Sequence, residues 1–470
     1  MKKIISIVLL VIMFFSILVS CSGEQIELMN FLNSGEDELT FDGITWTFGK
    51  VQDYFMDSDA IMGYVENTGF SDAARQRIRD IEEQFDISYE EITVERVNDE
   101  VLLDSMSGTS RFYAVQDESF FLVDGIRAGL YTDLTELSDY IDYRDSYKWG
   151  GRNVLESLCW NGGLYAVVPM AMPLLSYSSA CNVIVANLDY ITAIGMPNPR
   201  TYYENNEWTW DKLKEILPLY TQQSDNPDNY KYGLLCGSGW FTRGMIYSNC
   251  KSSVVMDANG KYVPVTSTDA GLRALQESWD ICFGELGYTI DAGPSCLDYE
   301  EIFPNGNHAL VDIDAYQVYS TTKSLAYTMP NIAILPFPTG PDMEVGSIPS
   351  SSSSLDYSTA IPKIVDDPHV SAIIIDALYT PFAGYETEES LIEYMTDNYF
   401  SNEEDSRIFI EIAKNMLYEY TDVGFSGYAY DSIEEDQSVT EFISSNMATA
   451  QSIIDEYIVN HITSADEIFG

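Results

Sequence analysis

The chain contains few basic residues and almost no histidine. Lysine and arginine together number 24 against 74 acidic residues, so the 470-residue chain has a formal net charge of −50 at pH 7. This charge repels phosphate backbones and anionic lipid headgroups, which excludes nucleic acid and a polybasic membrane face as expected partners. Three histidines and seven scattered cysteines leave little material for a soft-metal centre. We therefore expect no cofactor and no metal.

Long apolar runs are also scarce, and the one present lies at the beginning. Lys2 and Lys3 precede an almost wholly apolar stretch over residues 4–19, an arrangement typical of an export signal. The following Leu-Val-Ser-Cys, ending at Cys21, resembles the lipobox of bacterial lipoproteins. The resemblance implies a signal peptide over residues 1–20 and lipidation of Cys21 by acyl chains such as palmitate, which would hold the protein outside the cell at the cell membrane. A plain signal peptide or an N-terminal membrane helix is the alternative.

The remaining sequence is globular in composition. Apolar residues make up 46% of the chain, and the length suits two or three domains. Residues 21–39 are acidic and polar and predict a tether. Six further cysteines allow fifteen pairings. Cys236 and Cys250 bracket one aromatic loop and are a candidate bridge, and small buried thiols are an equally good interpretation.

Helix and strand patterns alternate along the chain, which predicts an α/β fold. Residues 44–48 and 92–97 have strand patterns, and residues 111–115 predict a third strand that ends near Asp117. In such sheets, ligands bind beyond the carboxyl ends of the strands. A second unit begins after residue 164, and from residue 389 to the end the pattern is helical.

Several segments occur in an order that is similar to the extracellular solute-binding proteins of ABC importers, specifically the carbohydrate-type, maltose-binding-like family 1. These are Gly162–Pro169, Val183–Tyr190, Ile194–Pro199, Trp208–Leu213, Phe303–Val311, Ile332–Pro338 and Ala360–Lys363. Three departures stand out. Ser110-Arg111 replaces a usual Pro-Asp, Ala186-Asn187 replaces Tyr-Asn, and residues 225–229 are too short for the calcium loop of some relatives.

The resemblance implies a two-lobe periplasmic-binding-protein-like (type II) fold with an interlobe cleft. Three hinge crossings are expected near residues 165–180, 333–340 and 383–390. Lobe 1 would comprise residues 40–168 and 338–385, and lobe 2 would comprise residues 169–335 and 388–470.

Sugar recognition needs flat aromatic faces for C–H groups and polar side chains for hydroxyls. Asp117 and Glu118 follow the third strand, and by resemblance Glu118 falls where relatives place a ligand-binding acid. Trp240 and Phe241 follow a glycine loop where relatives supply an aromatic platform, and Tyr316 stands where relatives often have a stacking tryptophan. The remaining candidate ligand residues are Asp314, Trp46, Arg243, Tyr357 and Tyr177. At each position, core packing or a solvated charge is the alternative.

These features predict a non-enzymatic, surface-anchored substrate-binding component of an ABC transporter. It would capture a solute, foremost a sugar or oligosaccharide, by hinge closure and deliver it to the permease. The alternative is a secreted carbohydrate-active lipoprotein, either a glycoside hydrolase or a protein that captures glycans without transport. A hydrolase needs two carboxylates about 5–10 Å apart. Peptides and polyamines also suit an acidic cleft.

Overall fold

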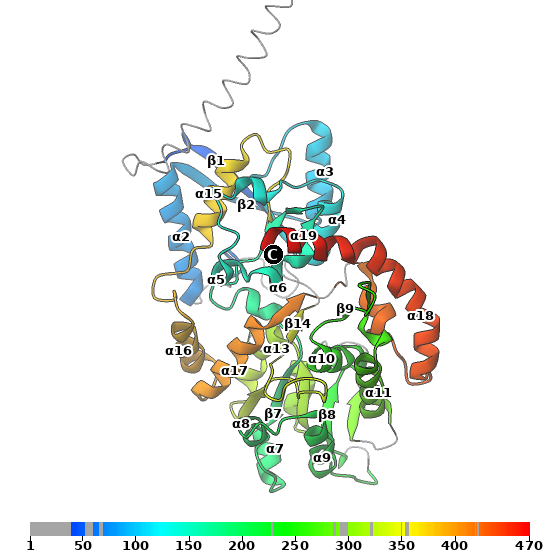
Figure 1. Ribbon diagram of the computed structural model, residues 1–470. Helices are drawn as coiled ribbons and strands as arrows, with labels where there is room; N and C mark the ends of the chain where they lie inside the picture. The colour runs from blue at the N-terminus through cyan, green and yellow to red at the C-terminus, as the bar shows by residue number, and fades with distance from the viewer. Residues whose placement is uncertain are drawn as a thin grey trace, which may run out of the picture.

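In the computed structural model, the chain forms two lobes, each built on a mixed β-sheet flanked by helices (Figure 1). The structure describes residues 39–51, 60–64, 69–226, 229–284, 288–291, 299–319, 323–348, 350–352, 357–418, 420 and 423–470. Cys21 and the expected signal peptide and tether lie outside these ranges, apart from residue 39. The α/β two-lobe architecture expected from the sequence is confirmed.

The first lobe surrounds a sheet with strand order β2-β1-β3-β15-β6. Its strands are β1 (Ile44–Val51), β2 (Ile87–Val94), β3 (Ala114–Asp117), β6 (Ala166–Val167) and β15 (Ser358–Ala360), with the small pair β4 (Cys159–Trp160) and β5 (Gly163–Leu164). Its helices are α2 (Gly69–Phe85), α3 (Val97–Ser107), α4 (Ser119–Arg127), η1 (Leu134–Leu137), α5 (Ser146–Trp149), α6 (Arg152–Leu155), η2 (Glu156–Leu158) and α15 (Pro368–Leu378). β1 runs parallel to β2 and β3, whereas β15 runs antiparallel to β3 and β6.

The second lobe surrounds a sheet with strand order β11-β8-β12-β7-β13. Its strands are β7 (Val183–Asn187), β8 (Tyr232–Cys236), β11 (Thr289–Asp291), β12 (His308–Ile313) and β13 (Ile332–Leu335), with the hairpin β9 (Val254–Met256) and β10 (Tyr262–Pro264). Its helices are α7 (Leu188–Ala193), α8 (Arg200–Glu204), α9 (Trp210–Tyr220), α10 (Ser238–Cys250), η5 (Val265–Ser267), α11 (Asp269–Phe283), α12 (Tyr299–Ile302), η6 (Phe303–Asn305), α13 (Ala315–Tyr319), α14 (Leu325–Thr328) and α17 (Glu403–Lys414). β8 runs parallel to β11 and β12, and β7 runs antiparallel to β12 and β13.

The two lobes are joined by several segments that lie at the boundary between them. These segments include η3 (Ser176–Ser179), β14 (Ser350–Ser352), α16 (Glu388–Asn398) and β16 (Met416–Tyr418), and the C-terminal part comprises η8 (Gly427–Asp431), α18 (Val439–Ile453), η9 (Ile454–Ile458) and α19 (Val459–Phe469). β14 pairs with β16, which places this ribbon between α10 of the second lobe and α6 of the first. The chain crosses between lobes after β6, after β13 and after α15.

The second crossing comes later than the sequence predicts. Thr339 forms a β-bridge with Thr209, and the Gly340 amide donates to the carbonyl of Ser248 at 2.9 Å. Residues 339 and 340 therefore lie on the second lobe, although the expected boundary placed 338–385 in the first. The chain reaches the first sheet at Ser358.

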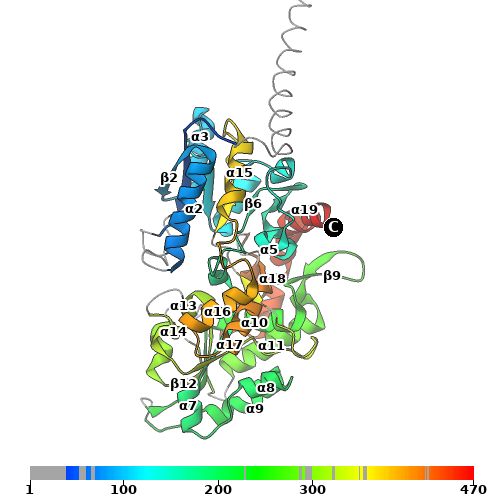
Figure 2. The ribbon, with the colours of Figure 1, turned by 90° about the vertical axis from the view of Figure 1, so that its left-hand side faces the viewer.

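The C-terminal helix adds a further crossing that the sequence does not predict. α18 packs on η8 and α11 of the second lobe, whereas α19 packs on β4, β5 and η2 of the first (Figures 1 and 2). Ser464 Oγ accepts from the Gly162 amide at 2.9 Å, and His461 Nδ1 donates to the Cys159 carbonyl at 2.7 Å. The expected division assigned all of residues 388–470 to lobe 2, so this assignment is wrong for α19. The π-helical turn η9 lies where the helix passes from one lobe to the other.

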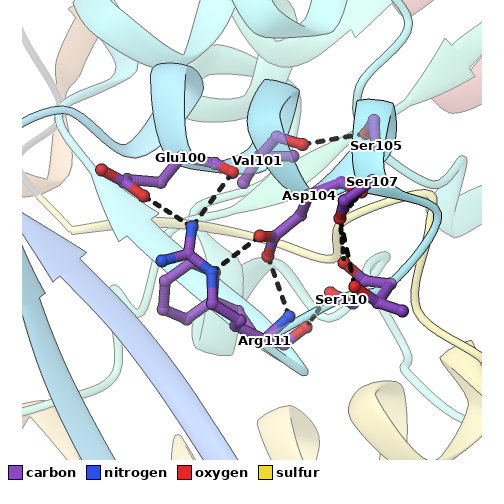
Figure 3. Close-up of polar contacts among 9 residues, drawn as sticks. Glu100, Val101, Asp104, Ser105, Ser107, Ser110 and Arg111 are labelled. Carbon is purple, nitrogen blue, oxygen red and sulfur yellow. Dashed lines mark hydrogen bonds and ion pairs between the residues drawn. The ribbon is translucent and has the colours of Figure 1, made fainter.

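Arg111, one of the departures from the family pattern, has a local role (Figure 3). Its Nε lies 2.7 Å from Asp104 Oδ1, its Nη2 lies 2.5 Å from Glu100 Oε2, and its backbone amide donates to Asp104 Oδ2 at 2.8 Å. Both carboxylates belong to α3. Arg111 therefore fastens α3 to the loop that leads into β3.

Among the described helices, none combines the length and apolar character that a membrane-spanning helix requires.

Candidate functional site

The order of strands in the second sheet brings several candidate residues to one edge. β8 and β12 are parallel, so their carboxyl ends at Cys236 and Ile313 meet there. β7 runs the other way, so its first residues lie at the same edge. Trp240 and Arg243 on α10 follow β8, and Asp314 and Tyr316 follow β12. Five of the expected ligand residues thus follow β8 or β12, Phe241 among them.

Asn182, which sequence reasoning missed, connects these segments. Its Nδ2 donates to both carboxyl oxygens of Asp312, at 3.2 and 3.1 Å, and to the backbone carbonyl of Trp240 at 2.9 Å. Asn182 has φ +62°, a left-handed conformation that asparagine tolerates well. A polar residue directly before a buried strand was the available sequence signal.

Burial controls the charge of Asp312. The side chain is 2% exposed, and this burial, reinforced by neighbouring Asp314, raises the pKa of Asp312 to about 8. The hydrogen bond from Asn182 and the positive charge of Arg243 partly oppose the rise in pKa. The carboxyl is therefore mostly protonated near neutral pH and can donate as well as accept a hydrogen bond.

Trp240 and Arg243 form a contact pair on the first turns of α10. The guanidinium carbon of Arg243 lies 4.8 Å from the centre of the half-buried Trp240 ring. Arg243 itself is 2% exposed, with Nη2 3.9 Å from Asp431 and Nη1 3.7 Å from Cys181 Sγ. Sequence reasoning left open whether Arg243 holds a hydroxyl or pairs with an acid. The structure places an acid, Asp431, beside it.

Tyr316 is half-buried and its hydroxyl accepts from Gln317 Nε2 at 3.1 Å. Asp314 is 3% exposed. Both follow β12 in the same short segment, so an aromatic ring and a carboxyl stand next to the Asn182–Asp312 pair.

Two expected ligand residues are core residues. Phe241 is fully buried, with its ring centre 5.2 Å from that of Phe337. Trp46 is fully buried on β1 and stacks on Phe48 and Tyr89 at 5.7 and 5.6 Å. The expected ligand role is corrected for both, because neither ring presents surface to a solute.

The first sheet offers a second polar edge. β3 ends at Asp117, and antiparallel β15 begins at Ser358, which pairs with Asp117. Asp117, Glu118 and Tyr357 therefore lie at one edge. Asp117 is 3% exposed, and burial raises its pKa to about 7, although the amides of Glu118 and Val97 donate to it and lower the pKa. Glu118 is half-buried at the N-cap position of α4.

Lys50 and Glu91 are further charged residues of this lobe, and neither is among the expected ligand residues. They form an ion pair near the carboxyl end of β1, and Lys50 Nζ also donates to the carbonyl of Ala60 at 3.0 Å. A lone lysine two residues beyond the strand predicted over residues 44–48 was the signal.

The segment that passes from the first lobe to the second after β6 contacts residues of both lobes near the two polar edges. The hydroxyl of Tyr64, in the first lobe, donates to the Pro173 carbonyl at 3.1 Å, and that of Tyr319, on α13, donates to the next carbonyl, Leu174, at 2.6 Å. The Ala315 amide donates to the Ala180 carbonyl at 2.9 Å. The two polar edges therefore face the same interlobe segment.

Tyr177 and Tyr357 pack in this region with 5% exposure each. Burial raises the pKa of the Tyr177 hydroxyl well above its ordinary value. The ring of Tyr357 lies against Gly63 and Leu175, where a β-carbon on Gly63 would come within 2.6 Å of the Tyr357 ring. Both tyrosines therefore offer little ring surface to a solute in this conformation.

A cavity of about 70 Å³ lies elsewhere between the lobes. It is lined by Asn153, Glu156, Ser157, Tyr247, Ser252, Ser253, Leu417, Tyr418 and Tyr420. The Tyr420 hydroxyl contacts Glu156 across it, and the buried Ser157 hydroxyl has no hydrogen-bond partner among the described residues. This polar cavity is large enough for ordered water, and none of the expected ligand residues lines it.

The described part of the chain contains no group of three or more His, Cys, Asp or Glu side chains placed to hold a metal ion. The edge of the second sheet instead combines the half-buried Trp240 indole with the buried side chains of Arg243, Asn182 and Asp312. The exposed part of the indole can stack on an apolar sugar face, and the three buried polar side chains hold the backbone and ring around it in place.

No protein-family model matches the chain, and no curated protein matches it. Solved structures share its fold. A sugar transporter from Rhizobium etli in an open conformation aligns with a TM-score of 0.60 and 14% identity, covering 86% of this chain and 99% of its own. UgpB from M. tuberculosis in complex with glycerophosphocholine gives 0.57 and 17%, covering 88% and 99%. Maltose-bound MalE3 from T. maritima gives 0.54 and 15%, covering 88% and 100%. At these identities the similarity establishes the fold of ABC solute-binding proteins.

Proposed function

We propose that this chain is the extracytoplasmic substrate-binding component of an ABC importer that captures a sugar or oligosaccharide by hinge closure and delivers it to a permease. The observation that carries the proposal is the Trp240–Arg243–Asn182–Asp312 cluster at the edge of the second sheet. Maltose bound to the structurally similar MalE3 supports a carbohydrate as the solute class.

Closure follows from the placement of the polar groups. The second lobe offers Trp240, Asp314 and Tyr316, and the first offers Asp117 and Glu118. A solute that contacts the residues of both lobes at once stabilises the closed arrangement of the lobes. Binding therefore shifts the population towards the closed form. The permease would then recognise the two lobes together.

The proposal includes lipidation of Cys21, at the end of the lipobox-like Leu-Val-Ser-Cys. An acyl anchor would keep the protein next to its permease and raise its effective concentration there. Acidic residues at both sheet edges favour neutral or cationic solutes, since an anion would meet Asp117 and Asp314.

The enzymatic alternative is a glycoside hydrolase, in which Asp117 and Asp314 would act as the opposed carboxyl groups. The raised pKa of Asp117, about 7, suits a general acid. Glycan capture without transport is the second alternative, and a requirement for a permease separates it from the main proposal.

A thermal-shift screen of the full chain in mild detergent, against mono- and oligosaccharides, tests the proposal. A cognate sugar raises the melting temperature by mass action. Chromatography of the same mixtures should recover every sugar unchanged. Release of smaller saccharides would favour the hydrolase, and the absence of a shift with any carbohydrate would contradict sugar capture.

A further inference from the structure

Two cysteine thiols lie close together in the second lobe, between the end of β8 and α11. Sγ of Cys236, the last residue of β8, lies 3.8 Å from Sγ of Cys282, near the end of α11. Both side chains are buried, with Cys236 0% and Cys282 9% exposed. The sequence offered Cys236 and Cys250 as a candidate bridge, with small buried thiols as an equally good interpretation.

The helix between them separates Cys236 from Cys250. Cys236 precedes Gly237, the N-cap of α10, and Cys250 is the last residue of that helix. Thirteen helical residues rise about 20 Å, which is far beyond the reach of a disulfide. Cys250 is therefore not the partner of Cys236.

An independent contact keeps Cys282 facing Cys236. Thr242 Oγ1 on α10 and Ser278 Oγ on α11 are 2.7 Å apart. Ser278 lies one helical turn before Cys282, on the same face of α11. This hydrogen bond, like both thiols, is buried, so α11 is held in register against α10 and β8.

We propose that Cys236 and Cys282 form a disulfide when the protein is exposed to an oxidising thiol–disulfide couple. A disulfide bond is about 2.05 Å long, so the sulfurs need to approach by only about 1.8 Å. The proposal rests on the extracytoplasmic location in the proposed function, because the cytoplasm keeps thiols reduced.

The reaction is a two-step exchange with a small disulfide. The thiolate of Cys282, the more accessible of the two, attacks one sulfur of the oxidant, and one small thiol leaves. The Cys236 thiolate then attacks Cys282 Sγ and releases the second small thiol. The two protein thiols lose two electrons and two protons, and the oxidant's S–S bond is reduced to two thiols.

The disulfide would stabilise the part of the second lobe that leads into the helix with the candidate ligand residues. It joins α11 to the end of β8, one residue before the turn that begins the helix carrying Trp240 and Arg243. The two cysteines are 46 positions apart in the sequence. A disulfide that closes a loop of this length lowers the entropy of the unfolded chain.

The test treats the full chain in mild detergent with oxidised glutathione, blocks remaining thiols with iodoacetamide under denaturing conditions, and digests it without reductant. We expect a linked peptide pair containing Cys236 and Cys282, and a melting temperature a few degrees above that of the reduced chain. The linked pair should disappear in Cys236→Ser and Cys282→Ser and persist in the matched control Cys250→Ser.

Alkylation of both Cys236 and Cys282 after oxidation, in a chain whose circular dichroism is unchanged, would overturn the proposal, as would linkage of either to another cysteine. The wild-type peptide map decides this even where a serine variant fails to fold. Sugar-induced thermal shifts measured on the reduced and oxidised samples test the proposed function separately, since the reduced protein keeps every residue of the candidate site.

Discussion

Asn182 donates from a single amide nitrogen to both carboxyl oxygens of Asp312, at 3.2 and 3.1 Å. The two residues come from the start of one strand and the end of its antiparallel neighbour, which fixes them at the same sheet edge. The pair therefore joins two neighbouring strands through buried side chains at the sheet edge that precedes Trp240 and Tyr316.

The protonation of Asp312 makes stability depend on pH. Its folded pKa of about 8 lies above the ordinary aspartate value, so the folded state binds the extra proton between about pH 4 and 8. Stability should therefore fall as pH rises through this window, by up to about 1.4 kcal/mol per pH unit for this group.

Asp312→Asn, whose amide resembles the protonated carboxyl, should flatten this dependence. Urea unfolding at pH 5, 6.5 and 8 measures it, with the exposed Asp225→Asn as a control that leaves the slope unchanged. An equal slope in Asp312→Asn and wild type would show that Asp312 is ionised in the folded chain.

The buried His461 side chain should make folding stability depend on pH in the opposite direction. Burial, and the adjacent Arg127 charge, lower its pKa to about 3, below its ordinary value of 6.5. Between these values the unfolded chain binds more protons, so the stability contribution is complete above about pH 6.5 and is lost as pH falls.

His461→Ala also removes the hydrogen bond to the Cys159 carbonyl. We expect it to lower the free energy of unfolding at pH 7 by about 1–3 kcal/mol and to loosen α19. Hydrogen exchange across residues 459–469 measures the loosening. Unaltered exchange in α19 would refute its docking on the first lobe through this residue.

Gly63 is required by both conformation and space. Its φ is +84°, and a β-carbon there would come within 2.5 Å of Leu175 and 2.6 Å of Tyr357. Gly195 has a similar φ of +73° with nothing within 4 Å, so Gly195→Ala measures the conformational cost alone.

We expect Gly195→Ala to cost about 1 kcal/mol and Gly63→Ala about 1–3 kcal/mol more. Equal losses of unfolding free energy would mean that the Gly63–Leu175–Tyr357 packing gives way easily.

Trp240 should carry much of the binding energy. Trp240→Ala should weaken binding of the sugar found in the screen by tenfold or more, about 1.4 kcal/mol, and leave the unliganded fold intact. Trp279→Ala is the matched control, because Trp279 is a half-buried tryptophan of the same lobe on α11. Calorimetric titration compares them, and equal affinities in Trp240→Ala and wild type would remove Trp240 from the site.

Sequence patterns located residues at the sheet edges, but they did not show which side chains point into the core. The rule that ligands bind beyond strand ends located Asp117, Glu118, Trp240, Asp314 and Tyr316, and the structure places all of them at the two edges. Trp46 and Phe241 failed as candidates because a strand or helix pattern does not say which aromatic ring points into the core.

Contacts between distant segments were beyond the reach of sequence patterns. Asp431 approaches Arg243 from 188 positions away, and α19 returns to the first lobe through a helix whose pattern is continuous. The hairpin at residues 257–261 was predictable because its turn chemistry is local, and the Asp257 amide donates to the Lys261 carbonyl at 2.8 Å.

Small-angle X-ray scattering, with and without the sugar that raises the melting temperature, tests most directly whether this chain captures a solute by closing two lobes on it. We predict a smaller radius of gyration with that sugar, an unchanged radius with a sugar that gave no shift, and full recovery of the sugar afterwards. An unchanged radius at saturating cognate sugar, or recovery of the sugar in cleaved form, would contradict capture by closure.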